Sequence, residues 1–254
     1  GQGLVRTVDD FGSTGEAPSH PELLDYLAAR LIEHKWSVKA LIREIALSRT
    51  WQLSSEHGDT QFSIDPNNRL HWRMNKRRLD AESVRDAVLS ASGALVRSRP
   101  LGTFLSEVGE GNVGMNVFEP EIRAIETNHR SVYLPRVRNV IPEILELFDA
   151  PDADAVCGMR DTTASPLQAL FMMNNPFVMK QAELLAKRIE ARPEAEQVDL
   201  TYKITLGRAP TDAEQRQTAA FMQQFSVTAL RDIKHQLSAY CQALLCTTEF
   251  STID

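Results

Sequence analysis

Helix-start signals recur along this chain and constrain its fold more than any other feature. Ser165 and Asn175 are each followed by a proline, and a polar N-cap before a proline at the first helical position is a favoured helix start. Residues 19–22 and 211–214 match the capping box, in which two side chains satisfy free amides of the first turn. Apolar residues at helical spacing follow each signal, so the sequence predicts a mainly α fold.

Turn signals separate the expected helices. Trp36 lies in the short connection between the first two helices, which argues for an antiparallel pair, and Asp65–Asn68 has turn chemistry. Ser131–Leu134 alternates briefly and predicts a short strand. Ser92 and Gly93 are either tolerated within a helix or mark its end. Helices are expected to start near Ser19, Ser37, Asp80, residue 138, Ser165, Asn175, residue 198, Thr211 and Leu230.

Residues 98–130 interrupt the helical pattern with several glycines and prolines. A loop of this length is uncommon unless it is functional or packs as a unit of its own. Within it, Gly109–Gly114 matches the dinucleotide motif G-x-G-x-x-G, but it lacks the strand before and the helix after that the motif requires. We predict a single multi-helix domain over residues 1–254, with this irregular excursion against it and at most a short strand pair.

Composition excludes several classes of protein. The chain has 254 residues and a formal net charge of −6, which argues against a strongly basic nucleic-acid binder. No run approaches the ~18 uncharged apolar residues that a membrane-spanning helix needs. The three cysteines, Cys157, Cys241 and Cys246, are too few for a disulfide scaffold and form no Cys-x-x-Cys pair. We expect Cys241 and Cys246 to be buried, inert thiols.

Motifs that carry chemistry are missing from the sequence. The six histidines do not pair at the spacing of a zincin helix, and no nucleophile-elbow, S-x-x-K or P-loop pattern occurs. Asp149, Asp152 and Asp154 lack the glycine and glutamate of a calcium loop. His20 is expected to be structural, at the start of the first helix. We therefore expect no catalytic residue, no metal site and no cofactor in this chain.

The densest charged stretch is Arg73–Asp86, where arginines alternate with acidic residues. The mixture of signs favours an internal salt-bridge network that holds helices together. An anion-binding strip is the alternative, because arginine binds carboxylates, sulfates and phosphates bidentately, and a solvated face is the third interpretation. The candidate ligand-binding residues are Arg73, Arg77, Arg78, Arg85, Arg130, Arg136 and Arg160.

Several longer motifs occur in a characteristic order. They include Arg130–Pro135, Phe148–Pro151, Thr162–Phe171, Asn174–Val178 and Gly207–Thr211. Together they resemble the planctomycete domain of unknown function 1553 family, and the resemblance covers nearly the whole chain. That family has no established activity and no catalytic residues to transfer. Gly109–Gly114 departs from the Gly-Gly-Pro that is usual in the family at this place.

The resemblance implies a context for the chain. Such domains lie at the C-terminal end of large exported proteins, after cytochrome c-like haem domains and a companion uncharacterised domain. We therefore expect an exported, periplasmic or cell-surface location, although no signal peptide lies in this chain. The chain is expected to be a C-terminal fragment that lacks the first helix of the family, which would leave an apolar patch exposed.

Two functions are carried forward. The first is a non-catalytic interaction or scaffolding domain whose partners are the other domains of the same polypeptide, with no nucleic acid and no membrane span. The alternative is an anionic-polysaccharide-binding or hydrolytic domain that uses an arginine-rich cleft, and a surface for electron transfer with the upstream haem is a third idea. If the alternative holds, Arg77, Arg78 or Arg130 should line a cleft with guanidinium groups that lack partners.

Overall fold

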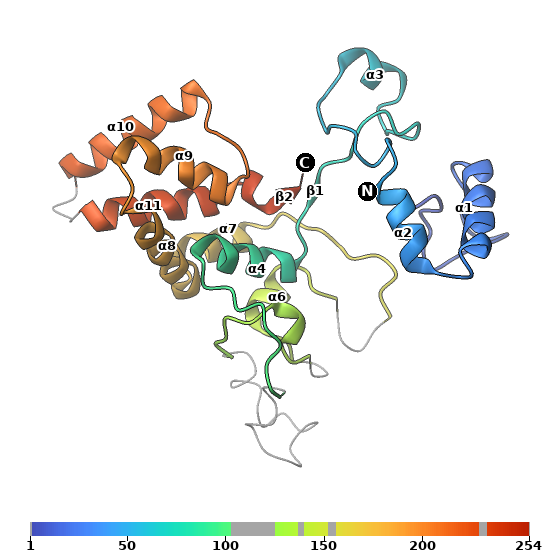
Figure 1. The fold of residues 1–254 in the computed structure, drawn as a ribbon, viewed down its shortest axis with the longest axis horizontal. Coiled ribbons are helices and arrows are strands. Elements are labelled where there is room, and N and C mark those ends of the chain that lie inside the picture. The colour runs from blue at the N-terminus through green and yellow to red at the C-terminus, as the bar shows by residue number, and fades with distance from the viewer. Residues whose placement is uncertain (1, 103–124, 137–139, 152–155, 229–232, 254) are drawn as a thin grey trace. The chain divides into compact units, whose positions relative to one another are not determined.

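The computed structural model describes residues 2–102, 125–136, 140–151, 156–228 and 233–253. Within them it has ten α-helices and one two-stranded sheet, which confirms the mainly α fold and the short strand pair (Figure 1). By internal contacts, unit 1 comprises Gly1–Arg78 with Thr252–Asp254, and unit 2 comprises Leu79–Ser251. A single cooperative domain over residues 1–254 stays a prediction.

Unit 1 is a small assembly of three helices and the strand pair. Its elements are α1 (Pro21–Glu33), α2 (Val38–Ala46), α3 (Asp59–Ile64), β1 (Arg77–Arg78) and β2 (Thr252–Ile253). The strands are antiparallel, with Arg77 opposite Ile253. As predicted, Trp36 lies in the α1–α2 turn, where its φ is 62°, and the Ser37 side chain caps α2 by accepting the Ala40 amide.

The start of α1 differs from the prediction. His20, not Ser19, is the N-cap residue, and it makes no side-chain capping bond. The reason is Pro21, which takes the first helical position and keeps the preceding residue out of the helical region, so His20 has φ −139° and ψ 84°. The Ser19 hydroxyl instead lies 3.0 Å from Nδ1 of His20. The predicted capping box is therefore wrong.

Unit 2 is a helical body built around α8. Its elements are α4 (Ala81–Ser92), η3 (Ser131–Tyr133), α6 (Glu143–Leu147), α7 (Pro166–Asn174), α8 (Pro176–Ile189), α9 (Glu194–Thr205), α10 (Asp212–Thr228), α11 (Ile233–Leu245) and η4 (Glu249–Ser251). Helix α8 packs against α4, α7, α9 and α11, and α9 and α10 lie beside α11 (Figure 1). Val88, Val178, Leu185, Ile189 and Cys241 are fully buried between these helices.

The predicted helix boundaries of unit 2 are mostly confirmed. The Ser165 hydroxyl caps α7 in a complete capping box, and the Asn175 side chain caps α8 by accepting the Phe177 amide at 2.9 Å. The Thr211 hydroxyl accepts the Glu214 amide, and the Glu214 carboxylate accepts the Thr211 amide. Gly93 ends α4 in the left-handed conformation that glycine adopts without strain.

Three sequence predictions in unit 2 are wrong. Helix α9 starts at Glu194, four residues before the expected residue 198. Ser131–Tyr133 forms a 3-10 helix rather than a strand, because the amide and hydroxyl of Ser131 both donate to the Asp86 carboxylate instead of to a neighbouring strand. Helix α6 starts at Glu143 rather than near residue 138. Pro142 has no amide to donate and therefore occupies the N-cap.

Part of the predicted excursion lies outside the described residues. The part outside comprises residues 103–124 and includes Gly109–Gly114. Asp152 and Asp154, two of the three aspartates of the apparent calcium loop, also lie outside the described residues. On the described part, Val96 forms a single parallel bridge with His129. Among the described residues, no helix combines the length and the apolar character needed to cross a membrane.

Candidate functional site

Two of the four predicted arginines of unit 2, Arg130 and Arg160, line one cleft, here called the α4 cleft. Asp80 caps α4 by accepting the Ser83 amide. Glu82 and Asp86 follow, and their spacing of four residues puts them on one face of the helix. The charged residues that line the cleft are Asp80, Glu82, Asp86, Arg97, Arg130 and Arg160. Acidic and basic groups are thus equally represented along this cleft.

The arginines of the α4 cleft bind its carboxylates. The Nη1 atom of Arg160 lies 2.5 Å from Glu82 and 3.7 Å from Asp80, and the hydrogen bond to Glu82 raises the pKa of the Arg160 guanidinium. Arg136 approaches Glu82 at 3.9 Å. These groups are partly exposed, so each pair adds little stability by itself. These ion pairs are of the kind expected for the internal salt-bridge network that the alternating charges of Arg73–Asp86 favour.

Arg130 is more exposed than Arg136 and Arg160. Its Nε lies 3.9 Å from the Asp86 carboxylate, and its side chain is 54% exposed. Arg77 and Arg78 form strand β1 of unit 1, and they are not among the residues that line the α4 cleft. Of the three arginines expected to line a cleft without partners, the structure places Arg130 in one, beside Asp86.

Arg85 lies in the interior of unit 2, where it is 4% exposed. Its guanidinium donates to the carbonyl oxygens of His129 and Thr127 and to the Ser131 hydroxyl, and it lies 5.8 Å from the centre of the Phe177 ring. Burial lowers the pKa of Arg85 from its ordinary value. These contacts tie α4 to the segment at residues 127–131, so the position of Arg85 is structural.

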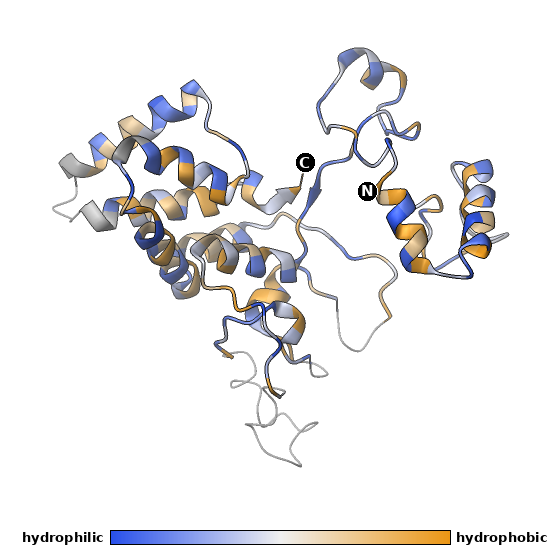
Figure 2. Cartoon of the chain, viewed as in Figure 1, coloured by the Kyte–Doolittle hydropathy of each residue, from blue (hydrophilic) through white to orange (hydrophobic). Residues whose placement is uncertain are grey.

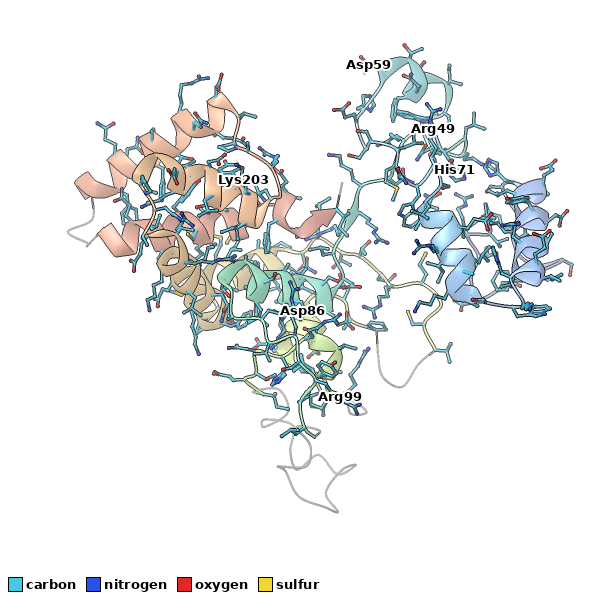
Figure 3. The ribbon with its side chains drawn as sticks, in the orientation of Figure 1. Arg49, Asp59, His71, Asp86, Arg99 and Lys203 are labelled. Carbon is cyan, nitrogen blue, oxygen red and sulfur yellow. The ribbon has the colours of Figure 1, made fainter. Side chains whose placement is uncertain are left out.

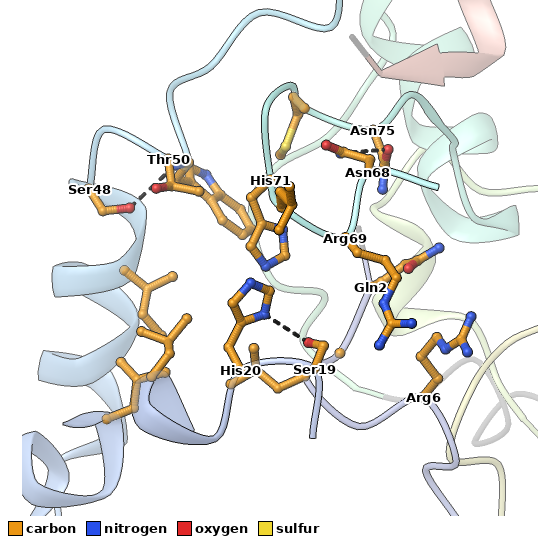
Figure 4. Close-up of a pocket in the computed structure, with 18 of the residues that line it drawn as sticks. Gln2, Arg6, Ser19, His20, Ser48, Thr50, Asn68, Arg69, His71 and Asn75 are labelled. Atoms are coloured by element: carbon orange, nitrogen blue, oxygen red, sulfur yellow. Dashed lines mark hydrogen bonds between the residues drawn. The ribbon is translucent and has the colours of Figure 1, made fainter. Parts of the chain in front are cut away.

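A second concave site lies in unit 1, here called the histidine pocket (Figure 4). It has a volume of about 670 Å³. At its centre the rings of His20 and His71 stack, with centroids 4.8 Å apart and an angle of 26° between the rings. The basic and aromatic side chains around them are Arg6, Arg69, Arg73, Tyr26 and Trp51. Arg73 is the predicted site residue that this pocket contains.

Hydrogen bonds within residues 65–75 position the basic side chains of the pocket. The Asp65 carboxylate accepts the amides of Arg69 and Leu70 at 3.0 and 2.7 Å. The Asn68 side chain accepts the Trp72 amide and donates to the Arg73 carbonyl. Asp65 and Asn68 are both buried. Local side-chain bonds of this kind fix a loop without an apolar core.

The loop also holds two residues in the left-handed backbone region. Asn68 has φ 51° and His71 has φ 54°, and asparagine and histidine are among the residues that tolerate this conformation best. His71, which lies in this loop after α3 (Figure 3), thereby stacks on His20. Burial, with a smaller contribution from the charge of His20, lowers the pKa of His71.

The carboxylates of the histidine pocket already have cationic partners. Glu16 accepts from Nε of Arg6 at 2.8 Å, and this bond lowers the pKa of Glu16. Glu44 accepts from Arg30 and lies 2.9 Å from Nε2 of His34; these two contacts, the bond from Arg30 above all, lower its pKa to about 2. Both carboxylates are therefore ionised and occupied at neutral pH.

Two arginines of the pocket retain open donors. Within the described part of the chain, the Arg69 guanidinium has no hydrogen-bonded acceptor or ion-pair partner. Nε of Arg73 is buried without a hydrogen-bond acceptor, and the Arg73 guanidinium lies 5.0 Å from the centre of the Trp72 ring. Figure 4 shows Arg69 beside Arg6, on one side of the histidine pair. This arrangement can bind an anion.

The sequence did not predict that most residues of the histidine pocket would lie together. Its walls come from residues 2–6, 16–27, 44–51 and 68–75, and no fixed spacing links these segments. The polar turn residues at 65–68 were the sequence feature that pointed to this region. They predict a fixed loop, but they do not predict which residues that loop faces. His20 lies at the start of α1 as predicted but makes no side-chain capping bond, so its structural role stays a prediction.

Metal ligands and thiols complete the inventory of reactive groups. The residues that the structure describes contain no cluster of three His, Cys, Asp or Glu side chains able to hold a metal ion. Cys241 is fully buried as predicted, and burial raises its pKa to about 12. Cys246 is half-buried rather than buried as predicted, and burial raises its pKa as well. Cys157 is exposed.

Comparison with known proteins gives one match. The sequence model of a family described as PSD1, protein of unknown function (DUF1553), matches residues 1–222. This range includes the histidine pocket and the α4 cleft. No curated protein and no solved structure matches the chain.

Proposed function

Since this chain belongs to the DUF1553 family of proteins of unknown function, we propose that it is a non-catalytic interaction domain of an exported multidomain protein. Its partners are the cytochrome c-like domain and the companion uncharacterised domain of the same polypeptide. The observation that carries the proposal is an exposed group of apolar side chains on the α1–α2 pair of unit 1.

This group, here called the apolar patch, consists of Ile32, Trp36, Val38 and Ile42. Their exposed fractions are 59%, 71%, 60% and 59%. They span the end of α1, the turn and the first turns of α2 (Figure 2). Large exposed apolar groups mark interaction sites, and tryptophan is enriched at the centres of such sites.

The α4 cleft supports a scaffolding role for unit 2. Its arginines and carboxylates bind one another, and Arg85 binds backbone carbonyls. Charges arranged in this way hold α4 against its neighbours.

Hydrogen exchange tests the interaction function. We expect the amides of residues 32–42 to exchange more slowly when the separately expressed companion domains are added to the chain. W36S and I42S should abolish this protection, because each removes a large apolar contact. L167S is the matched control, since Leu167 is 63% exposed in unit 2. Exchange rates in residues 32–42 that neither companion domain changes would refute the proposal.

Binding of an anionic polysaccharide is a second candidate function. The open donors of Arg69 and Arg73 favour it. A thermal-shift screen with uronic-acid and sulfated oligosaccharides tests it, because a ligand that binds the native state raises the melting temperature. A melting temperature unchanged by every acidic oligosaccharide would exclude this function.

A further inference from the structure

We propose that the histidine pocket binds one acidic sugar residue of a glycan chain. Arg69 and Arg73 hold its carboxylate, and its ring packs beside the stacked His20 and His71. This inference rests on the second function proposed above and assigns its site to unit 1 instead of the α4 cleft.

The charge inventory of the pocket points to an anionic ligand. Glu16 is bound by Arg6, and Glu44 is bound by Arg30, His34 and Tyr26. Arg69 lies within electrostatic range of the Glu16 and Asp65 carboxylates, but within the described residues neither carboxylate accepts a hydrogen bond from its guanidinium, whose donors stay open to a ligand. The Arg73 side chain lines the same pocket and, within the described part of the chain, its guanidinium has no hydrogen-bonded acceptor or ion-pair partner, so it can donate to a ligand carboxylate.

The walls of the pocket favour a ring that carries hydroxyl groups. The stacked imidazoles and Trp51 offer flat faces. Hydroxyl and amide groups of Ser19, Thr50 and Asn75 line the same cavity, so they can bond to the hydroxyl groups of a sugar. A volume of about 670 Å³ falls in the usual range for small-molecule sites, ~300–1,000 Å³. Ser19 contacts His20 and Asn75 accepts from Asn68, but each keeps further hydrogen-bonding capacity that a sugar hydroxyl can use and the ring of an aromatic acid cannot.

The α4 cleft is the competing site, and its chemistry differs. Arg160 is bound to Glu82 at 2.5 Å, and Arg130 faces Asp86. An acidic ligand there would have to displace carboxylates that belong to the protein and would be repelled by them. In the histidine pocket Arg69 feels the charge of Glu16, but Glu16 is hydrogen-bonded to Arg6 instead, so a ligand carboxylate displaces no protein carboxylate from Arg69.

The test is calorimetric titration of the whole chain with a galacturonic acid trimer. A neutral galactose trimer and benzoate are the comparison ligands. We expect the acidic trimer to bind, the other two to bind at least about tenfold more weakly, and the affinity to fall with rising salt. R69Q and R73Q should each weaken binding of the acidic trimer about tenfold, the effect of one lost charge-assisted hydrogen bond. R69K should restore part of the affinity.

Two control variants separate the site from the function. Arg43 is an exposed arginine of unit 1 that does not line the pocket, so R43Q should leave binding unchanged.

Loss of binding in R130Q, with R69Q and R73Q unaffected, would overturn the assignment to the pocket and leave the second function standing. A trimer that does not bind the wild-type chain would overturn the further inference, whereas the thermal-shift screen with uronic-acid and sulfated oligosaccharides decides the second function. Tighter binding of benzoate than of the trimer would overturn the sugar assignment. Far-UV circular dichroism checks that each variant is folded.

Discussion

His71 combines a left-handed backbone, a stacked partner and partial burial. Burial, and then the charge of His20, lower its pKa below the ordinary value of 6.5. The unfolded chain keeps the ordinary value, so below about pH 6.5 it binds the proton more readily than the folded chain does. The stability of unit 1 should therefore be complete above this pH and decrease as the pH falls below it.

Urea unfolding followed by tryptophan fluorescence checks this expectation. We expect a lower free energy of unfolding at about pH 5.5 than at about pH 7.5, and H71Q should reduce the difference because glutamine does not titrate. His57 has a 53% exposed side chain in the same unit, and H57Q serves as the matched control. Identical pH dependence in wild-type chain and H71Q would contradict the role of His71.

Single residues could be predicted from the sequence where their bonds are local. Ser37, Ser165 and Asn175 cap helices by accepting amides two or three residues away, so short spacing was enough. The stacking of His20 on His71 joins segments far apart in the chain and depends on the fold of residues 65–75. Arg73 was predicted as a binding residue from its charged neighbours, and the pocket around it was not.

At the scale of one element, the capping residues at the N-terminus of α7 fix both this helix and its contact with α6. The Ser165 hydroxyl accepts the Gln168 amide, and Gln168 in turn accepts the Ser165 amide and donates to the Leu147 carbonyl. The same cap thus fixes the helix and its contact with the end of α6. Helix α6 was predicted too long for a related reason, since a proline decides where it can begin.

Removing the α7 cap should have a measurable effect on unit 2. We expect S165A to lower the free energy of unfolding by about 1 kcal/mol, the usual effect of losing an N-cap side chain. Urea unfolding followed by circular dichroism at the helix band measures it. S90A is the control, because Ser90 is exposed within α4 and alanine favours a helix there. A loss no larger in S165A than in S90A would show that the cap is dispensable.

At the scale of the whole molecule, burial is unevenly distributed. Every buried apolar side chain of the described residues lies in unit 2, between Ala81 and Phe250. The buried side chains of unit 1 are polar, namely Ser55, Asp65 and Asn68. The helical periodicity predicted the apolar faces of both units equally well. It could not predict that the faces of α1 and α2 would stay exposed, because exposure depends on which neighbours pack on them.

This difference leads to an expectation about cooperativity. Burial of apolar surface is the main source of stability, so unit 1 should unfold at a lower urea concentration than unit 2. Trp36, Trp51 and Trp72 are the three tryptophans of the chain, and all lie in unit 1. Their fluorescence therefore reports unit 1, whereas helical circular dichroism reports mainly unit 2.

We expect the fluorescence midpoint to lie below the dichroism midpoint, since probes coincide only in a two-state transition. L185A should lower the dichroism midpoint alone, because Leu185 is fully buried in unit 2. Coincident midpoints that L185A shifts together would instead establish the single cooperative domain that the sequence predicts.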